Sequence, residues 1–274
     1  MQLNTVKYIL SSVFRRNHII LTNSNYKTVP GAVNLHWWKL ESPEQNVGDF
    51  LSTIVVDYMM KHHNCTDSKA GKTRHLYAIG SIIDGAYQNA TVWGSGIHRG
   101  NPKYWWKSFR KLDVRAVRGP KTREILLQNG YDCPAVYGDP AILLPLIYQP
   151  KPAAVLSDFR VVPNHSIPCD HALMLNPMVT DWQGFIDELV SAKRIISSSL
   201  HGIILAEAYG VPAILVHDNS LSLFKYEDYY SSTGRDIFPV ASSVEEALTM
   251  TPPPLPDLTR LQQGLIESFP KDLW

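Results

Sequence analysis

The sequence has few cysteines and almost no net charge. Its three cysteines, Cys65, Cys133 and Cys169, lie far apart and are odd in number. They indicate neither a disulfide framework nor a zinc knuckle, and a reducing cytoplasm fits this usage. The formal net charge of +1 argues against a nucleic-acid-binding protein, because such proteins usually carry a basic excess.

Long apolar runs are also missing. No stretch reaches the roughly 18 apolar residues of a membrane-spanning helix. The apolar segment 8–21 is interrupted by Arg15 and Arg16 and has no small-residue cleavage site after it, so it does not resemble a secretory signal. We interpret it as the first helix and strand of the fold. An amphipathic basic segment that rests on a membrane surface is the alternative.

Several chemical motifs are absent as well. No group of His, Asp and Glu residues has metal-ligand spacing, so we expect no metal. The lack of a Gly-x-Ser-x-Gly motif weakens an acyl-transfer interpretation. The glycines of Trp93–Gly96 match neither a dinucleotide nor a P-loop fingerprint, and no cofactor is predicted.

The chain instead contains short apolar runs that alternate with helical patterns. Hydrophobic residues make up 45% of the 274 residues, which is enough for a full core. Alternation of this kind is typical of a parallel α/β sheet, where ligands bind at the carboxyl ends of the strands. The strand-like runs that end in Gly, Ser, Asp or Arg are 76–81, 91–96, 113–120, 136–140, 159–163 and 194–202.

A proline-containing segment divides the chain. We interpret residues 149–152 as a linker. The predicted organisation is an N-terminal α/β domain over 1–150 and a second α/β domain over 151–250. A C-terminal helix over 251–274 is expected to pack back on the first domain.

The most informative turn is Ser197–Gly202, where an apolar run ends in three serines, a leucine and a His-Gly pair before a helical pattern that stops at Gly210. Serine hydroxyls, free N–H groups and the positive end of a helix dipole would meet there and suit a phosphate or carboxylate. His201 adds a proton donor. A helix cap with a buried histidine is the alternative.

Four further segments are candidates. Arg118 ends a strand and could hold an anion bidentately, whereas a surface salt bridge is the alternative for it and the better one for Arg115. Asn46 and Asp49 flank a glycine turn and serve either as sugar-orienting groups or as a plain N-cap. Gly94 and Ser95 allow close ligand approach. The segment Phe224–Tyr230 suits sugar stacking or forms an amphipathic surface helix; His165 is a weaker candidate at a strand end.

On these residues the chain resembles the polysaccharide pyruvyl transferase family, most of all the xanthan-type ketal-pyruvate transferases. The similarity runs from about Asn46 to the C-terminus. Several long motifs occur in one order, which makes chance similarity a poor explanation. They are Asn46–Asp49, Thr91–Ile97, Leu112–Arg123, Val136–Pro140, Ile196–Gly202, Lys225–Tyr230 and Asp272–Trp274.

The resemblance implies two Rossmann-like domains that face a cleft, a GT-B-like arrangement, with phosphoenolpyruvate as donor substrate in that cleft. It implies an acceptor in a polysaccharide repeat unit, in the xanthan-type case a mannose of a lipid-linked oligosaccharide. That acceptor would place the enzyme at the cytoplasmic face of the inner membrane as a peripheral protein. The implied donor-binding residues are Arg118, Ser198, Ser199, Leu200, His201, Gly94 and Ser95.

The expected chemistry assigns roles to a few side chains. His201 would be the acid that protonates the donor methylene, and Asp49 the base or orienting group for the acceptor hydroxyls. Two other functions stay open, because fold does not fix function: a sugar-nucleotide glycosyltransferase and a non-catalytic glycan-binding scaffold. The implied acceptor-binding residues are Asn46, Asp49, Lys225, Tyr226 and Tyr229.

Overall fold

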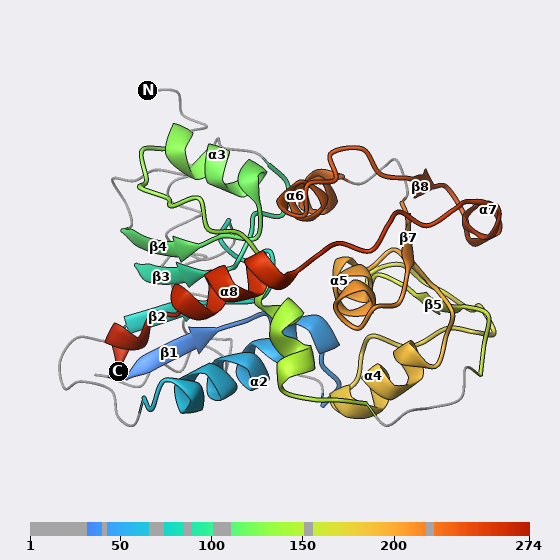
Figure 1. Ribbon diagram of the computed structural model, residues 1–274, viewed down its shortest axis with the longest axis horizontal. Coiled ribbons are helices and arrows are strands. Elements are labelled where there is room, and N and C mark those ends of the chain that lie inside the picture. Colours follow the sequence, from blue (N-terminus) through green and yellow to red (C-terminus); the bar gives the residue numbers. More distant parts are fainter. Residues whose placement is uncertain are drawn as a thin grey trace, which may run out of the picture.

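The computed structural model describes residues 32–39, 43–65, 74–84, 89–100, 111–150, 156–217 and 222–274. These residues form two four-stranded sheets with helices around them (Figure 1). Every strand pair in both sheets is parallel, which confirms the predicted α/β class. The helix and strand predicted within 8–21 lie outside the described residues.

The first sheet has the strand order β1-β2-β3-β4. Its strands are short; β3 is buried throughout, whereas β4 alternates apolar and polar residues. Two helices accompany them, and Gly130, shortly after the second, has the positive φ that is typical of a helix stop (78°). The elements are β1 (Val33–His36), α2 (Val47–His62), β2 (Arg74–Tyr77), β3 (Ala90–Trp93), β4 (Leu112–Ala116) and α3 (Pro120–Gln128).

The second sheet has the order β5-β6-β7-β8. The apolar helix predicted after the serine turn is α5. It is buried along nearly all of its length, because strands and helices pack against it on several sides. Gly210 ends it with φ of 76°. The elements are β5 (Arg160–Val162), α4 (Trp182–Val190), β6 (Ile195–Ser197), α5 (Leu200–Ala208), β7 (Ala213–Val216), α6 (Phe224–Ser232), β8 (Val240–Ala241) and α7 (Val244–Thr249).

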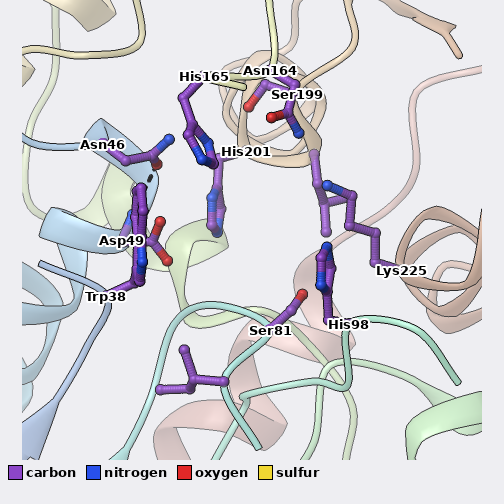
Figure 2. A pocket seen from close by; sticks show the side chains of 12 residues that line it. Trp38, Asn46, Asp49, Ser81, His98, Asn164, His165, Ser199, His201 and Lys225 are labelled. Carbon is purple, nitrogen blue, oxygen red and sulfur yellow. Dashed lines mark hydrogen bonds between the residues drawn. The ribbon is translucent and has the colours of Figure 1, made fainter. Parts of the chain in front are cut away.

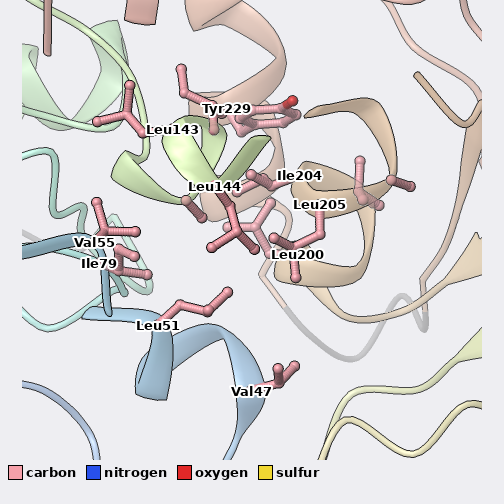
Figure 3. Packing of buried hydrophobic residues seen from close by; sticks show 14 of the residues in the cluster. Val47, Leu51, Val55, Ile79, Leu143, Leu144, Leu200, Ile204, Leu205 and Tyr229 are labelled. Carbon is pink, nitrogen blue, oxygen red and sulfur yellow. The ribbon is translucent and has the colours of Figure 1, made fainter. Parts of the chain in front are cut away.

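A short helix, η3 (Pro140–Leu146), packs between α2, beside the first sheet, and α5, beside the second. It is a 3-10 helix with Pro145 inside it, and proline cannot supply the N–H of a regular helix. Ala141, Ile142, Leu143 and Leu144 are fully buried. Figure 3 shows Leu143 and Leu144 among side chains of α2 and α5. One hydrophobic cluster therefore spans residues from both sheets.

The C-terminal segment returns to the first sheet. Helix α8 (Thr259–Glu267) ends earlier than predicted, and a 3-10 turn, η4 (Lys271–Leu273), follows Pro270. The indole of Trp93 on β3 donates to the carbonyl of Leu265 at 2.9 Å. Arg115 on β4 forms ion pairs with Asp113 and Asp272, both 2.8 Å, so it is a surface salt-bridge residue. The division into domains at residue 150 stays a prediction.

Within the described ranges, no helix has the length and apolar character needed to cross a bilayer.

Candidate active site

A cleft of about 300 Å³ lies where the carboxyl ends of the two sheets face each other (Figure 2). The segments after β1, β2 and β3 and the start of α2 form one wall. The segments after β5 and β6 and the start of α6 form the other. Ligand binding at strand carboxyl ends was the expectation for this fold class. The lining residues are Trp38, Asn46, Asp49, Ser81, Ile82, His98, Asn164, His165, Ser199, Leu200, His201 and Lys225.

Two helices direct their N-termini at this cleft. Ser199 caps α5, and its hydroxyl accepts from the N–H of Gly202 at 3.4 Å. Asn46 caps α2, and its side chain accepts from the N–H of Asp49 at 3.3 Å. Both caps line the cleft. Unpaired N–H groups and the helix dipole make such ends favourable for anions.

The serine turn has a mixed role. Ser197 is fully buried and bonds to the carbonyls of Val162 and Ser199, both at 2.8 Å. Ser198 accepts from the N–H of Asn164 at 2.8 Å and does not line the cleft. Of the three predicted serines, only Ser199 reaches the cleft wall, because the other two hydroxyls hold the turn against β5 and the loop after it.

His201, in the first turn of α5, packs against the first turn of α2. A methyl group at Gly48 would lie 2.0 Å from its Nδ1, so only glycine leaves room for the ring. Its Nε2 lies 3.7 Å from Oδ2 of Asp139. In Figure 2 His201 lies between Asp49 on one side and Lys225 on the other. His201 belongs to a helix beside the second sheet. It therefore lies against the backbone of α2, beside the first sheet, and close to the carboxylates of Asp49 and Asp139.

Asp49 lies beside this histidine. Burial raises the pKa of Asp49 to about 6, while the charge of His201 lowers it and that of Asp139 raises it further. Gly80 makes room for the carboxylate: its φ is +108°, and a methyl group there would lie 2.7 Å from Oδ1 of Asp49. A carboxyl group with a pKa near neutrality suits a proton acceptor.

The remaining titratable groups in the wall are basic side chains. Burial and the positive charge of Arg118 lower the pKa of Lys225 to about 8, although Asp49 opposes this effect. Burial and four neighbouring bases, Lys225 first, lower the pKa of His98 to about 4. The pKa of His165 is lowered for the same reasons. A negatively charged ligand would reduce the repulsion between these bases and stabilise their protonated forms. This wall of the cleft therefore favours an anion.

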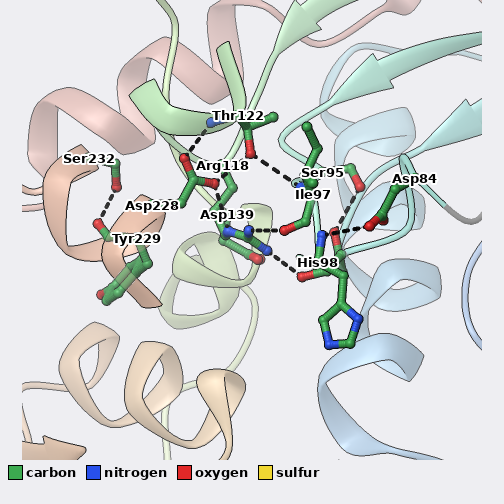
Figure 4. Close-up of polar contacts among 12 residues, drawn as sticks. Asp84, Ser95, Ile97, His98, Arg118, Thr122, Asp139, Asp228, Tyr229 and Ser232 are labelled. Atoms are coloured by element: carbon green, nitrogen blue, oxygen red, sulfur yellow. Dashed lines mark hydrogen bonds and ion pairs between the residues drawn. The ribbon is translucent and has the colours of Figure 1, made fainter. Parts of the chain in front are cut away.

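Arg118, predicted to hold the donor, does not line the cleft. Its side chain is 0% exposed and pairs with Asp228 of α6 at 3.1 Å. It also donates to Ser81 Oγ at 2.5 Å. A further bond runs to the carbonyl of Ile97 at 2.8 Å (Figure 4). Ser81 lies in the cleft wall, so the guanidinium stands directly behind that wall.

Four other predicted residues also lie outside the lining set. Gly94 and Ser95 serve the packing of the first sheet: a methyl group at Gly94 would lie 2.4 Å from Pro140, and Ser95 donates to the carbonyl of Gly80 at 2.8 Å. Tyr226 is buried and donates to the carbonyl of Ser198 at 2.7 Å. Tyr229 is buried and donates to Glu207 at 2.6 Å. The aromatic residues of 224–230 thus pack rather than face a sugar.

Sequence reasoning missed part of the lining. Trp38, Ser81, Ile82, His98 and Asn164 all follow strands of the two sheets, and their place at strand ends was the signal that could have found them. The Trp38 ring contacts that of His165 in a tilted arrangement, with ring centroids 4.6 Å apart. Among the described residues, no group of three His, Cys, Asp or Glu side chains has the arrangement of a metal site.

Together, the fold and the cleft define an α/β protein whose cleft places an imidazole and a carboxyl group beside a basic wall. A model of the polysaccharide pyruvyl transferases matches residues 66–219, more than half of the chain. The protein therefore belongs to the polysaccharide pyruvyl transferase family.

Two individual proteins are also similar to this chain. An uncharacterized protein of Acanthamoeba polyphaga mimivirus is 27% identical over 216 residues, which cover 69% of this chain and 71% of the viral protein. A functionally uncharacterized protein of Klebsiella pneumoniae, known as a crystal structure, is 14% identical with a TM-score of 0.49. The match covers 84% of this chain and 94% of that one.

Proposed function

We propose that the protein transfers pyruvate from phosphoenolpyruvate to a hexose of an exopolysaccharide or capsular repeat unit. The product is a ketal, bridging the 4- and 6-hydroxyls, and phosphate is released. Membership of the pyruvyl transferase family supports the transferred group. The single observation that carries the donor assignment is the meeting of Lys225, His98 and the α5 N-terminus in one cleft with His201 and Asp49.

The donor carries a phosphate and a carboxylate, and the basic wall offers partners for both. Lys225 and the N–H groups that follow Ser199 receive one anionic group in this proposal. Ser81 receives the other, with the positive charge of Arg118 behind it. Arg118 then acts on the donor through Ser81 and not by direct contact, because its side chain is fully buried.

The reaction needs one acid and one base. His201 gives a proton to the methylene carbon, and the adjacent carbon becomes oxocarbenium-like. The first sugar hydroxyl bonds to that carbon and gives its proton to Asp49. The second hydroxyl then displaces phosphate, which leaves with the electron pair of the broken C–O bond and takes up the second hydroxyl proton. General acid–base help of this kind is worth about 10²–10⁴-fold in rate.

The acceptor side of the proposal uses Asn46, Asp49 and Asn164, whose side chains line the cleft. Trp38 offers an indole face for a sugar ring. We also propose that the acceptor is lipid-linked and that the enzyme works at the cytoplasmic face of the inner membrane. In this view the two halves of the chain are Rossmann-like domains of a GT-B-like enzyme.

The test is phosphate release from phosphoenolpyruvate, with and without lipid-linked oligosaccharide, for wild type and His201→Ala. We expect acceptor-dependent release that is lost in the variant. A matched control is His62→Ala, because His62 is an exposed residue at the end of α2. Release that does not require an acceptor, or that survives in His201→Ala, would contradict the proposal.

A further inference from the structure

Asp139 is a buried carboxylate that the proposed reaction does not use. It is 0% exposed and stands immediately before η3. Its Oδ1 accepts from the N–H of Ala141 at 3.0 Å and so caps that helix. Its Oδ2 is buried without a hydrogen-bond partner among the described residues. The nearest cationic group to this oxygen is Nε2 of His201, at 3.7 Å.

The histidine shows the complementary feature. Nε2 of His201 is also buried and lacks a hydrogen-bond partner among the described residues. The side chain as a whole is 11% exposed, so the exposed part belongs to other ring atoms. Nδ1, the second nitrogen, lies against Gly48 at the start of α2. Two buried polar atoms with no other partner therefore face each other, and such atoms are costly unless they interact.

The surrounding core fixes this pair. Asp139 is the N-cap residue of η3. This short helix packs between α2 and α5 (Figure 3). His201 belongs to the first turn of α5, and Gly48 to the first turn of α2. The carboxylate, the ring and the opposing backbone thus come from three elements that share one apolar cluster.

We propose that Asp139 is a positioning residue that keeps a proton on Nε2 of His201 and leaves Nδ1 as the nitrogen that exchanges protons with the substrate. This inference rests on the proposed function of His201 as acid. A carboxylate beside one ring nitrogen fixes the tautomer, the ring orientation and the charge of the protonated form. Nε2 cannot reach a ligand from its buried position, so Nδ1 is the nitrogen available for chemistry.

The two carboxylates near His201 then have different tasks. Asp49 lines the cleft and meets the acceptor, whereas Asp139 lies outside the lining set. The charge of Asp139 also contributes to the raised pKa of Asp49, against His201 and Lys225, which lower it. Removing the charge of Asp139 should therefore move the titration of Asp49 to lower pH.

The experiment compares Asp139→Asn with wild type. Asparagine keeps an oxygen for the N–H of Ala141 but presents an amide to Nε2, which favours the opposite tautomer. We expect kcat to fall by about 10²–10⁴-fold, an unchanged KM for phosphoenolpyruvate, and an acid limb of the pH profile at lower pH. Asp181→Asn is the control: Asp181 caps α4 through Gly184 at an exposed site and should leave all three unchanged.

A second measurement needs neither substrate nor a variant of Asp139. The ¹⁵N shifts of the ring nitrogens of His201, assigned by comparison with His201→Gln, report which nitrogen carries the proton in the wild-type protein. We expect Nε2–H. A neutral ring that carries its proton on Nδ1, or an Asp139→Asn protein with wild-type kcat, would overturn the role of Asp139. If no acceptor supports turnover, the proposed function fails, while the ¹⁵N spectra still decide the tautomer.

Discussion

Gly48 and His201 are in such close contact that no other residue fits at position 48: a methyl group there would lie 2.0 Å from Nδ1 of His201. Gly48 belongs to the first turn of α2 beside one sheet, and His201 to the first turn of α5 beside the other. The contact brings the two helix N-termini together at the cleft. It also makes the position of the ring depend on the backbone of α2.

Gly48→Ala is therefore expected to lower kcat strongly, because the new methyl group displaces the imidazole. Alanine favours a helix interior over glycine by about 1 kcal/mol, so a loss of activity would not come from weaker helix formation. Phosphate release and thermal unfolding measure the two effects. The control is Gly264→Ala in α8, where a methyl group would meet Val136 at an ordinary 3.4 Å. Wild-type kcat in Gly48→Ala would contradict the contact.

The buried ion pair of Arg118 and Asp228 predicts a stability effect. Replacing Arg118 by methionine leaves an unpaired buried carboxylate, and the free energy of unfolding should fall by about 3–5 kcal/mol. Asp228 also accepts from the N–H and hydroxyl of Thr122, at 2.8 and 2.7 Å. Urea denaturation of both single variants and of Arg118→Met/Asp228→Asn forms a double-mutant cycle, in which the double variant should lose less than the sum.

A matched ion pair joins α3 to α6 at the surface. Lys121 of α3 and Glu227 of α6 lie 2.9 Å apart, with side chains 40% and 38% exposed. Because exposed ion pairs contribute about 0–1 kcal/mol, Lys121→Met should cost far less than Arg118→Met. Equal losses of stability in the two variants would mean that the buried ion pair of Arg118 and Asp228 contributes no more than the exposed one.

The donor assignment predicts selective stabilisation by phosphoenolpyruvate. A ligand at about 100 times its Kd adds roughly 2.7 kcal/mol to the free energy of unfolding. Phosphoenolpyruvate should therefore raise Tm, and a panel of nucleotide sugars should not. Lys225→Met should reduce the shift, because it removes a cation from the cleft wall. Stabilisation by a nucleotide sugar alone would favour a glycosyltransferase instead.

Local signals made much of the fold predictable. Five of the six predicted runs lie at parallel strands, whereas 136–140 forms only an isolated bridge between Tyr137 and Val117. Gly210 ends its helix with a positive φ. The start of α5 was predictable in the same way, because Ser199 and His201 belong to one continuous turn. These features depend on neighbours within a few residues, which the sequence displays directly.

Long-range pairing was not predictable. Arg118 was expected at a ligand, but its partner Asp228 lies 110 residues further along the chain. Tyr229 was expected at a sugar, yet it meets Glu207 from another helix. The residues around Gly48 in the sequence do not predict its contact with His201. Such contacts arise from the way η3 and the helices of both sheets pack together.

The pKa values of Asp49 and Lys225 predict a bell-shaped pH dependence of kcat/KM for phosphoenolpyruvate. Asp49 must be ionised to accept a proton, and its pKa is raised to about 6, so activity is lost as the pH falls through about 6. Lys225 must be protonated to bind the donor, and its pKa is lowered to about 8, so activity is lost as the pH rises through about 8.

Lys225→Arg separates these limbs, since arginine stays protonated at all accessible pH values. The alkaline limb should disappear or move well above pH 8, while the acid limb stays in place. Asp49→Asn should lower kcat at every pH and remove the acid limb. The profile of kcat alone should extend further to the alkaline side than that of kcat/KM, because the bound anion favours the protonated lysine. A wild-type alkaline limb that persists in Lys225→Arg would assign that titration to another group, with the proposed acid His201 as the first candidate.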